Sequence, residues 1–310
     1  MKIRRVALIG LGAIGSYLAS NLGPCLGDDF AVIADGDRGE RIRRDGIEVN
    51  GTLLHFQVLS SQEKSFEADL VIVITKMTQL SGALESIRNF VGPHTMIMTP
   101  LNGVESEAVA AKVYGEEKII WSLARASVVK QGSRVSFNPA VSNIELGEKN
   151  NPVVSERVAA LVSLFEASGI RCVVREDMEK AIWEKFVCNV SENQVSAVLG
   201  LPFGAWGDSD HANDLRLMAA KEVVAIAEKK GIHIPEDYAP DHRKSLMRHP
   251  KGNKASTLQD IENGRKTEVE MFAGTVIRLG KEYGVPTPVN EFLYHAIRVL
   301  EEKNEGKFEY

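Results

Sequence analysis

The chain has 310 residues with a formal net charge of -5, 44% hydrophobic residues and 25% charged residues. A chain of this length can bury a full core and is expected to form two domains. Its mildly acidic balance argues against nucleic acid or an anionic membrane as the main partner, so any anion site has to be local.

The cysteine pattern argues against a disulfide framework and against a metal site. Cys25, Cys172 and Cys188 are far apart and odd in number, and no CxxC or Cys/His cluster occurs. We therefore expect a reducing, cytoplasmic environment and no metal. The first apolar run stops after four residues at Gly10, which is too short for a secretion signal, and no segment approaches the ~20 apolar residues of a membrane span.

The start of the chain has the pattern of a dinucleotide-binding turn. Residues 3–9 predict a buried strand, and a helix is expected to run to about Leu22. The six residues between these elements are Gly10, Leu11, Gly12, Ala13, Ile14 and Gly15. In a G-x-G-x-x-G turn the first glycine allows the tight turn, the second lets the backbone approach a pyrophosphate, and the third lets helix and strand pack closely. N–H groups at the helix start can then hold phosphate oxygens.

The end of the second predicted strand, residues 30–34, leaves two cofactors open. Asp35 stands where a carboxylate accepts hydrogen bonds from a free ribose 2′-hydroxyl, which favours NAD. Arg38 follows three residues later, and a 2′-phosphate, as in NADP, prefers such a partner. The arginines behind it, which equally suit the solvated face of a helix, are Arg41, Arg43 and Arg44.

Further apolar runs extend the predicted sheet. Residues 70–74 and 96–99 are interpreted as strands, and Lys76 and Asn102 follow their carboxyl ends, where ligands bind in open α/β sheets. Both side chains are candidates to face the cofactor, although a solvated lysine and a turn asparagine explain them equally. Residues 119–126, 135–137 and 144–146 are expected to extend the same sheet with antiparallel pairing, and residues 171–174 form its last strand.

These patterns predict an α/β fold. An N-terminal Rossmann-type dinucleotide-binding domain is expected over residues 1–175 and an all-α domain over residues 176–310. Helices are expected at 177–200, 208–230, 237–248, 255–283 and 290–303, with a polar loop at 249–253. A Rossmann domain followed by a helical domain predicts a site in the cleft between them.

The helix expected at 177–200 carries a polar side. Lys185, Asn189 and Asn193 are spaced four apart and should share one side of it. Such a row would grip a polar ligand, whereas the simpler interpretation is the solvated stripe of an amphipathic helix. No histidine stands in a recognisable relay, which favours lysine as a proton donor.

Five segments resemble the 2-dehydropantoate 2-reductase (ketopantoate reductase) family, in the order and spacing of that family. They are GLGAIG at 10–15, ITKMTQ at 74–79, PLNGVE at 100–105, EKFVCNVSENQVSA at 184–197 and NKASTLQDIENGRKTEVE at 253–270. The resemblance implies reduction of 2-dehydropantoate to (R)-pantoate with NADPH, on the route to pantothenate and coenzyme A.

The resemblance also implies roles for individual residues. Lys185 matches the proton donor, and Glu268 matches a glutamate at the mouth of the cleft. Lys76 and Asn102 match cofactor contacts, beside the glycine turn. The positions that match substrate-binding residues are Asn102, Lys185, Asn189, Asn193, Asn253 and Ser256.

Three positions depart from the family pattern. The family usually carries an arginine where Asp35 stands, so NADP is expected with Arg38 as its partner, while NAD stays open. Gln194 replaces a frequent proline, and Phe203 occupies a position that is polar in some members. A paralogous NAD(P)-dependent reductase of another small 2-oxo acid therefore remains an alternative, as does a non-catalytic dinucleotide-binding protein. The apolar stripes of the helices at 208–230 and 255–283 leave a homodimer open.

Overall fold

The structure, a computed structural model, describes residues 2–126, 128–132, 134–248 and 250–308, and their side chains apart from those of residues 129–131. His249, in the polar loop expected at 249–253, lies outside the described residues. The chain divides into two units, Met1–Glu179 and Lys180–Tyr310.

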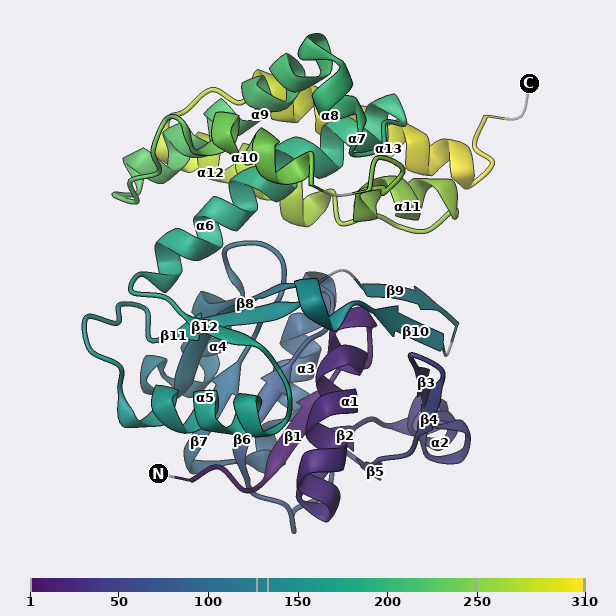
Figure 1. Ribbon diagram of the computed structural model, residues 1–310, viewed down its shortest axis with the longest axis vertical. Helices are drawn as coiled ribbons and strands as arrows, with labels where there is room; N and C mark the ends of the chain where they lie inside the picture. Colours follow the sequence, from purple (N-terminus) through teal and green to yellow (C-terminus); the bar gives the residue numbers. More distant parts are fainter. Residues whose placement is uncertain (1, 127, 133, 249, 309–310) are drawn as a thin grey trace. The chain divides into compact units, whose positions relative to one another are not determined.

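Unit 1 is built on an eight-stranded sheet of order β12-β11-β8-β7-β6-β1-β2-β5 (Figure 1). Its strands are β1 (Val6–Ile9), β2 (Phe30–Ile33), β5 (Gln57–Leu59), β6 (Ala68–Val73), β7 (Val91–Met98), β8 (Ile119–Arg125), β11 (Asn143–Gly147) and β12 (Cys172–Val174). All pairings from β5 to β8 are parallel, and β11 pairs antiparallel with β8. The predicted Rossmann-type sheet is confirmed, and so is an antiparallel pairing at its far side.

Helices cover both faces of this sheet, which explains why its central strands are unbroken apolar runs. In Figure 1, α1 (Ala13–Leu26) and α5 (Glu156–Ala167) lie in front of the sheet, and α3 (Leu80–Ser86) and α4 (Ser106–Tyr114) lie behind it. The stretch from Leu70 to Val73 is fully buried. The remaining helix of the α type that lies wholly in this unit, among the described residues, is α2 (Gly36–Asp45).

One predicted strand belongs to a different sheet. Residues 135–137 lie in β10 (Arg134–Phe137), which pairs antiparallel with β9 (Val128–Gln131) and parallel with β3 (Ile47–Val49). With β4 (Thr52–Leu54) these strands form a separate four-stranded sheet, so the assignment to the main sheet was wrong. The short connection between β9 and β10 favours a local hairpin, and Phe137 packs its ring 4.7 Å from that of Tyr17 on α1.

Unit 2 is helical within the described residues. Its elements are α6 (Met178–Cys188), the π turn η6 (Asn189–Asn193), α7 (Gln194–Leu199), α8 (Ala205–Asp208), α9 (Asp210–Lys229), α10 (Tyr238–Leu246), α11 (Ser256–Glu262), the π turn η7 (Glu270–Gly274), α12 (Thr275–Tyr283) and α13 (Pro288–Asn304). The helix expected at 177–200 is therefore interrupted by a π turn, which its apolar spacing did not indicate.

The prediction of one long helix at 255–283 was wrong, because the structure has three shorter elements there. The first of these elements, α11, ends at Glu262, because the next two residues, Asn263 and Gly264, form a helix stop. Gly264 has a φ of +62° and donates its N–H to the carbonyl of Ile261. Helical structure resumes with η7. Before it, the N–H and the hydroxyl of Thr267 both donate to the carboxylate of Glu301 on α13. An Asn-Gly pair is a turn signal that the apolar periodicity outweighed in the prediction.

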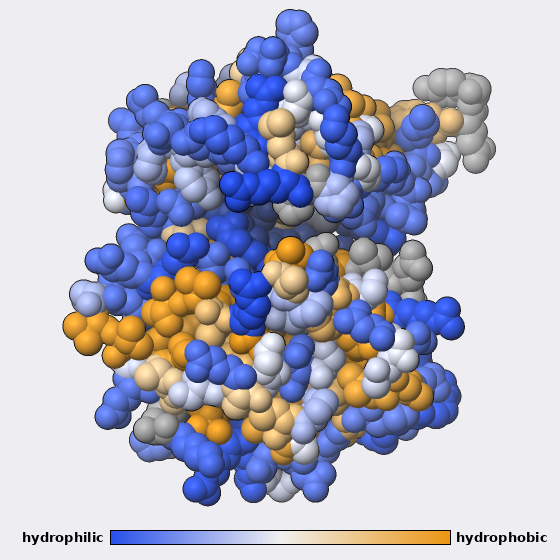
Figure 2. Space-filling view, in the orientation of Figure 1, coloured by the Kyte–Doolittle hydropathy of each residue, from blue (hydrophilic) through white to orange (hydrophobic). Residues whose placement is uncertain are grey.

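Figure 2 shows hydrophilic residues over most of the visible surface, with apolar areas between them. Exposed valines include Val153, which is 80% accessible, and Val154 beside it. Among the helices in the described parts of the chain, none has the length and apolarity that crossing a bilayer requires.

A buried carboxylate joins three strands at one side of the main sheet. Glu145 on β11 accepts a hydrogen bond from Nε of Arg125 on β8 at 2.6 Å and one from Nε of Arg175, just after β12, at 2.7 Å. Burial by itself raises the pKa of Glu145, but the hydrogen bonds and charges of the two arginines outweigh it and hold that pKa below its usual value.

We predict that Glu145→Gln weakens the acid sensitivity of the fold. A carboxylate with a lowered folded-state pKa stabilises the fold above its unfolded pKa of about 4.3, and this contribution is lost as the pH falls through the folded value. The variant should lose about 1–3 kcal/mol of unfolding free energy at neutral pH and show a shallower decline below about pH 4.5. Urea unfolding across this pH range measures both effects. If the unfolding free energy of the variant declined below about pH 4.5 as steeply as that of wild type, the lowered pKa of Glu145 would be contradicted.

Candidate active site

The glycine turn after β1 is held by close backbone contacts. Gly10 has a φ of +105°, and a Cβ there would lie 2.4 Å from the carbonyl oxygen of Ile74, just after β6. A Cβ on Gly15 would lie 1.9 Å from the carbonyl oxygen of Gly10. These two positions therefore require glycine, because a side chain would push α1 and β6 away from the end of β1.

Gly12 differs from the other two glycines because a Cβ there would meet no atom within 4 Å. It is the N-cap of α1, which has no side-chain cap and no acidic residue in its first turn. The first N–H groups of a helix have no partner within the helix, and they favour an anion in front of them. Open space and free helix donors at this position fit a dinucleotide pyrophosphate.

The predicted cofactor residues of unit 1 lie at one edge of the sheet. Ile9 pairs with Ile33 of β2 and with Val73 of β6, so the carboxyl ends of these strands are level. Asp35 follows β2 as the N-cap of α2, and Lys76, which is exposed, follows β6. The structure therefore brings these side chains to the edge where the glycine turn lies.

Asn102 reaches the same edge from β7. Ile72 of β6 pairs with Met98, the last residue of β7, and Asn102 follows four residues later, partly buried. The next residue, Gly103, has a φ of +96°, as a tight turn requires.

Two hydroxyls at this edge were missed by sequence reasoning. Thr75 Oγ1 and Thr99 Oγ1 follow β6 and β7, are buried, and have no hydrogen-bond partner within the described part of the chain. The side chain of Thr75 lies beside Gly10, 3.2 Å from the position of a Cβ on that glycine. A buried unpaired hydroxyl costs free energy, so a bound ligand at this edge would offset that cost. A hydroxyl directly after a buried strand is the sequence signal that could have found them.

Asp35 is held in place as a carboxylate. Its Oδ1 accepts hydrogen bonds from Ser60 Oγ at 2.8 Å and from the N–H of Ser61 at 2.9 Å. Slight burial raises its pKa, but these hydrogen bonds outweigh that effect and keep the pKa below its ordinary value. Arg38 lies in the first turn of α2 and is exposed.

Most other arginines of α2 already have acidic partners. Arg43 Nη1 lies 2.7 Å from a carboxylate oxygen of Glu40, and Arg44 Nε lies 2.6 Å from one of Asp45. These two arginines therefore belong to the solvated face of the helix, which leaves Arg38 as the nearest cationic candidate for a phosphate on the ribose.

In unit 2, Lys185, Asn189 and Asn193 are partly exposed within a helical stretch that is otherwise almost wholly buried. Between residues 181 and 198, the other partly exposed positions are Glu184 and Val198. The row therefore remains on an accessible side, although both asparagines belong to the π turn η6. π turns make i→i+5 hydrogen bonds and occur frequently at functional sites.

The other predicted residues of unit 2 lie on elements that pack around η6. Ser256 opens α11, Glu268 precedes η7, and both α11 and η7 contact η6. The backbone of Asn253 is fixed by a turn bond to Pro250 and by a bond from the N–H of Phe203 at 2.8 Å.

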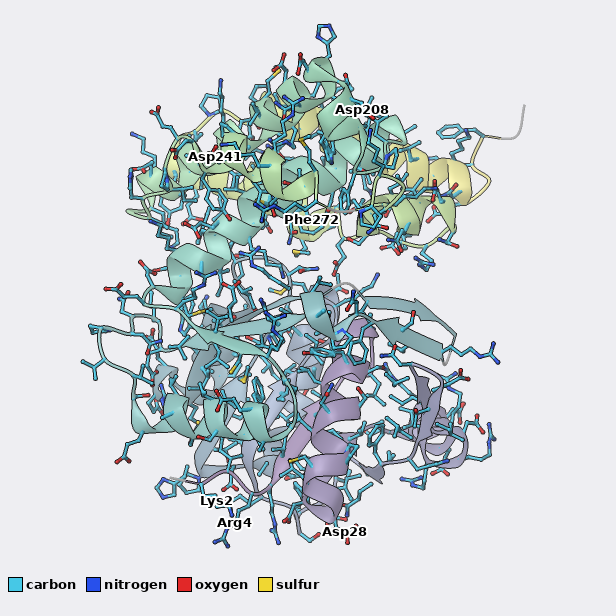
Figure 3. All side chains as sticks on the ribbon, viewed as in Figure 1. Lys2, Arg4, Asp28, Asp208, Asp241 and Phe272 are labelled. Atoms are coloured by element: carbon cyan, nitrogen blue, oxygen red, sulfur yellow. The ribbon has the colours of Figure 1, made fainter. Side chains whose placement is uncertain are left out.

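An aromatic contact joins η7 to α6. The ring of Phe272, which is labelled in Figure 3, lies 6.5 Å from that of Phe186 on α6, one residue beyond Lys185. The helix that carries Lys185 and the π turn that begins two residues after Glu268 are therefore packed together within unit 2.

One side-chain cluster beside η6 has metal-ligand chemistry. Cys188, Glu192 and His242 offer ligand atoms within 4.8 Å of one another. However, fully buried Arg216 places Nη1 3.6 Å from the Glu192 oxygen that also contacts His242 Nδ1 at 2.7 Å. Burial lowers the pKa of Arg216, and the Glu192 carboxylate opposes this effect. The guanidinium thus supplies the positive charge that a metal would bring, and the expected absence of a metal stays a prediction.

We predict opposite consequences for two alanine substitutions in the glycine turn. Gly15→Ala should lower the unfolding free energy by about 2–4 kcal/mol, because its Cβ would overlap the Gly10 carbonyl. Gly12→Ala should leave thermal unfolding almost unchanged but weaken NADH or NADPH binding at least about tenfold, because its methyl group would enter the space in front of the helix. Fluorescence titration of the reduced cofactor measures the affinity. Equal cofactor binding by Gly12→Ala and the wild type would contradict a pyrophosphate at this position.

Comparisons with known proteins agree with this architecture. Residues 6–151 match the family described as ketopantoate reductase PanE/ApbA, and residues 177–301 match its C-terminal domain. The 2-dehydropantoate 2-reductase of Aquifex aeolicus is 27% identical, covering 96% of this chain and 97% of that protein. The structure of 2-dehydropantoate 2-reductase from Geobacter metallireducens has a TM-score of 0.83 at 28% identity, covering 95% of this chain and 99% of that one.

A second structure shares the fold at lower sequence identity. D-mandelate dehydrogenase, in a ternary structure with NADH and anilino(oxo)acetate, has a TM-score of 0.87 at 23% identity over 97% of this chain and 99% of that one. Because the two family matches together span most of the sequence, the chain belongs to the ketopantoate reductase PanE/ApbA family and is an NAD(P)-dependent oxidoreductase.

Proposed function

We propose that the chain reduces the ketone of a small 2-oxo acid to a 2-hydroxy acid, and that 2-dehydropantoate is its substrate. The observation that carries this proposal is the accessible row of Lys185, Asn189 and Asn193 on an otherwise buried helical stretch. The family membership and the reductases related along the whole chain support the substrate.

The bound nicotinamide would supply the hydride to the ketone carbon. The Lys185 ammonium would stabilise the negative charge that develops on the ketone oxygen, an effect commonly worth about 3–4 kcal/mol per donor, and would then give that oxygen its proton. A lysine ammonium carries both the positive charge and the N–H proton that this step requires. Glu268, the second residue that we assign to catalysis, would orient this ammonium.

The amide and hydroxyl side chains of unit 2 would hold the rest of the substrate. Asn189 and Asn193 can each donate and accept hydrogen bonds, which suits the hydroxyl and carbonyl groups of a 2-oxo acid. Asn253 and Ser256 are assigned to its carboxylate. Such a set discriminates against analogues that leave a buried amide unpaired.

For the cofactor we propose a preference for NADH over NADPH, although the resemblance alone implied NADP. Asp35 is fixed by Ser60 and Ser61 and keeps its negative charge, which suits a ribose 2′-hydroxyl and repels a 2′-phosphate. Exposed Arg38 is the residue that would allow NADPH as a second cofactor.

A different small 2-oxo acid is the second candidate substrate, and Phe203 favours it. This side chain is partly buried and packs against the apolar cluster that contains Trp206 and Val195. An apolar residue at a position that is polar in some family members suits a less polar substrate. The value of kcat/KM for 2-dehydropantoate against a panel of other 2-oxo acids separates the two candidates.

The direct test follows the nicotinamide absorbance with 2-dehydropantoate, once with NADH and once with NADPH. The proposal expects turnover with both cofactors and a higher kcat/KM with NADH. Binding of the cofactor without turnover of any 2-oxo acid would contradict it and favour the non-catalytic alternative.

We predict that Lys185→Ala lowers kcat by about 10²–10³-fold, because the proton donor and its charge are lost. Cofactor affinity should stay within about twofold of wild type, since the glycine turn is untouched. Lys180→Ala is the matched control, because it removes a lysine from the same helix five residues earlier and should keep nearly full kcat. Turnover of Lys185→Ala within about tenfold of wild type would show that the assignment is wrong.

We predict that Asp35→Ala lowers kcat/KM for NADH by about tenfold or more and raises it for NADPH. The loss corresponds to a hydrogen bond with a charged partner, worth about 1.5–3 kcal/mol, and the gain to the removal of a repulsive charge. Steady-state kinetics with both cofactors measures the ratio. Arg38→Ala is the companion variant and should impair NADPH alone. If neither variant changed the ratio of kcat/KM for NADH to kcat/KM for NADPH, Asp35 and Arg38 would not determine the cofactor preference.

A further inference from the structure

The two π turns of unit 2 are neighbours, and each stands next to residues of the proposed reaction. The turn η6 contains Asn189 and Asn193, whereas η7 begins two residues after Glu268. The two turns pack against each other. A π turn interrupts the regular α-helical hydrogen bonds, so its backbone groups need other partners.

Gln194, the residue after η6, supplies such partners to both turns. Its side chain is fully buried, and Nε2 donates to the carbonyl of Val190 within η6 at 2.9 Å. Oε1 accepts the N–H of Ala273 within η7 at 3.1 Å. The second hydrogen of Nε2 is donated to Oδ1 of Asn290 on α13 at 3.1 Å. A single amide therefore bonds both π turns and a third helix.

The partner amide is fixed in the same way. Asn290 Nδ2 donates to Glu222 Oε2 on α9 at 2.7 Å and to the carbonyl of Ala219 at 3.3 Å. The Glu222 carboxylate also accepts the N–H groups of Val289 and Asn290, at 2.8 and 3.0 Å, in the first turn of α13. A negative charge at a helix N-terminus is stabilising. This charge and these bonds fix the orientation of Asn290, which in turn fixes that of Gln194.

Both amides use all of their donors, so the network has one arrangement. A rotated Gln194 amide would place its NH₂ group against the Ala273 N–H and its oxygen against the Val190 carbonyl. Glutamate would lack both donors, and an apolar residue would leave Ala273 N–H and Asn290 Oδ1 without these partners. Fully satisfied buried networks of this kind specify a unique packing.

We propose that Gln194 is a positioning residue for the reduction: it fixes the placement of Asn193, its neighbour in the chain, relative to Glu268, whose carbonyl accepts the N–H groups of Met271 and Phe272 in η7. This inference rests on the proposed function, because it concerns the same substrate-holding residues. Gln194 would act by holding the backbone of the two turns. Its side chain is fully buried and would not touch the substrate.

The test compares Gln194→Met with wild type and with Thr95→Val. Methionine has a similar length and no amide. Thr95 is also buried, on β7 of unit 1, where its hydroxyl donates to the carbonyl of Ala68 and accepts the N–H of Gly92. Thr95→Val therefore also loses buried hydrogen bonds, but none of them belongs to a π turn. We expect both variants to lose stability, and Gln194→Met alone to lower kcat, by about 10–100-fold.

The isotope effect separates positioning from simple destabilisation. With NADH deuterated at C4, Gln194→Met should show a larger primary isotope effect on kcat than wild type, because misplaced groups slow the chemical step. Thr95→Val should keep the wild-type isotope effect and KM, since a smaller folded fraction lowers only the amount of active enzyme. Equal kcat and an equal isotope effect in Gln194→Met and wild type would overturn the inference.

Amide hydrogen exchange keeps this inference distinguishable from the proposed function. In Gln194→Met the peptide that contains Ala273 should exchange faster than in wild type, and in Thr95→Val it should not. If the wild type turned over no 2-oxo acid, the proposed function would fail, and exchange would still decide whether Gln194 joins the turns. Unchanged exchange at Ala273 would overturn the bridge itself.

Discussion

Unit 1 depends on the close approach of three backbone segments at Gly10. The carbonyl after β6, the first turn of α1 and the end of β1 meet with no room for a Cβ at Gly10 or Gly15. This contact places the start of α1 at the carboxyl edge of the sheet, where its free N–H groups face open space at Gly12. The level ends of β1, β2 and β6 then bring Asp35 and the hydroxyl of Thr75 to the same edge.

In unit 2, the candidate polar residues lie on a helical stretch that is mostly buried. Lys185, Asn189 and Asn193 are partly exposed among buried neighbours, and both asparagines belong to the π turn η6. Buried polar groups flank that turn, with Gln194 bonded to η7 and Glu192 paired with Arg216 and His242. A site held by packed helices and satisfied hydrogen bonds keeps its geometry better than one held by loops.

The sequence predicted those parts of the fold that depend on local pattern. The apolar run that ends at Val73 and the glycine turn at 10–15 indicated a Rossmann-type sheet because few other structures fit a buried strand, three spaced glycines and a helix. The strand at 135–137 was assigned to the wrong sheet, because an apolar pattern says that a strand forms but not which partner it pairs with. The prediction of one helix at 255–283 was wrong because its apolar periodicity continues past the helix stop at Gly264.

The sequence could suggest candidate site residues where residue type and spacing carry a signal, but not the contacts that depend on tertiary packing. Lys185 and the asparagines were found from their spacing, and their roles remain proposals. The π turns were not found, since one extra residue within a long helical pattern hardly changes its period. The bridge from Gln194 to Asn290 joins residues 96 positions apart, and the contact of Glu192 with His242 joins residues 50 positions apart, so neither has a local signal.

The proposed reaction transfers a hydride from a nicotinamide to the C2 carbon of a 2-oxo acid. The most direct measurement uses NADH carrying deuterium at both C4 positions and determines the isotope content of the 2-hydroxy acid product by mass spectrometry. We expect one deuterium per product molecule, bonded to C2, with the hydroxyl proton drawn from the solvent. Product without deuterium at C2, or no product from any 2-oxo acid despite cofactor binding, would contradict it.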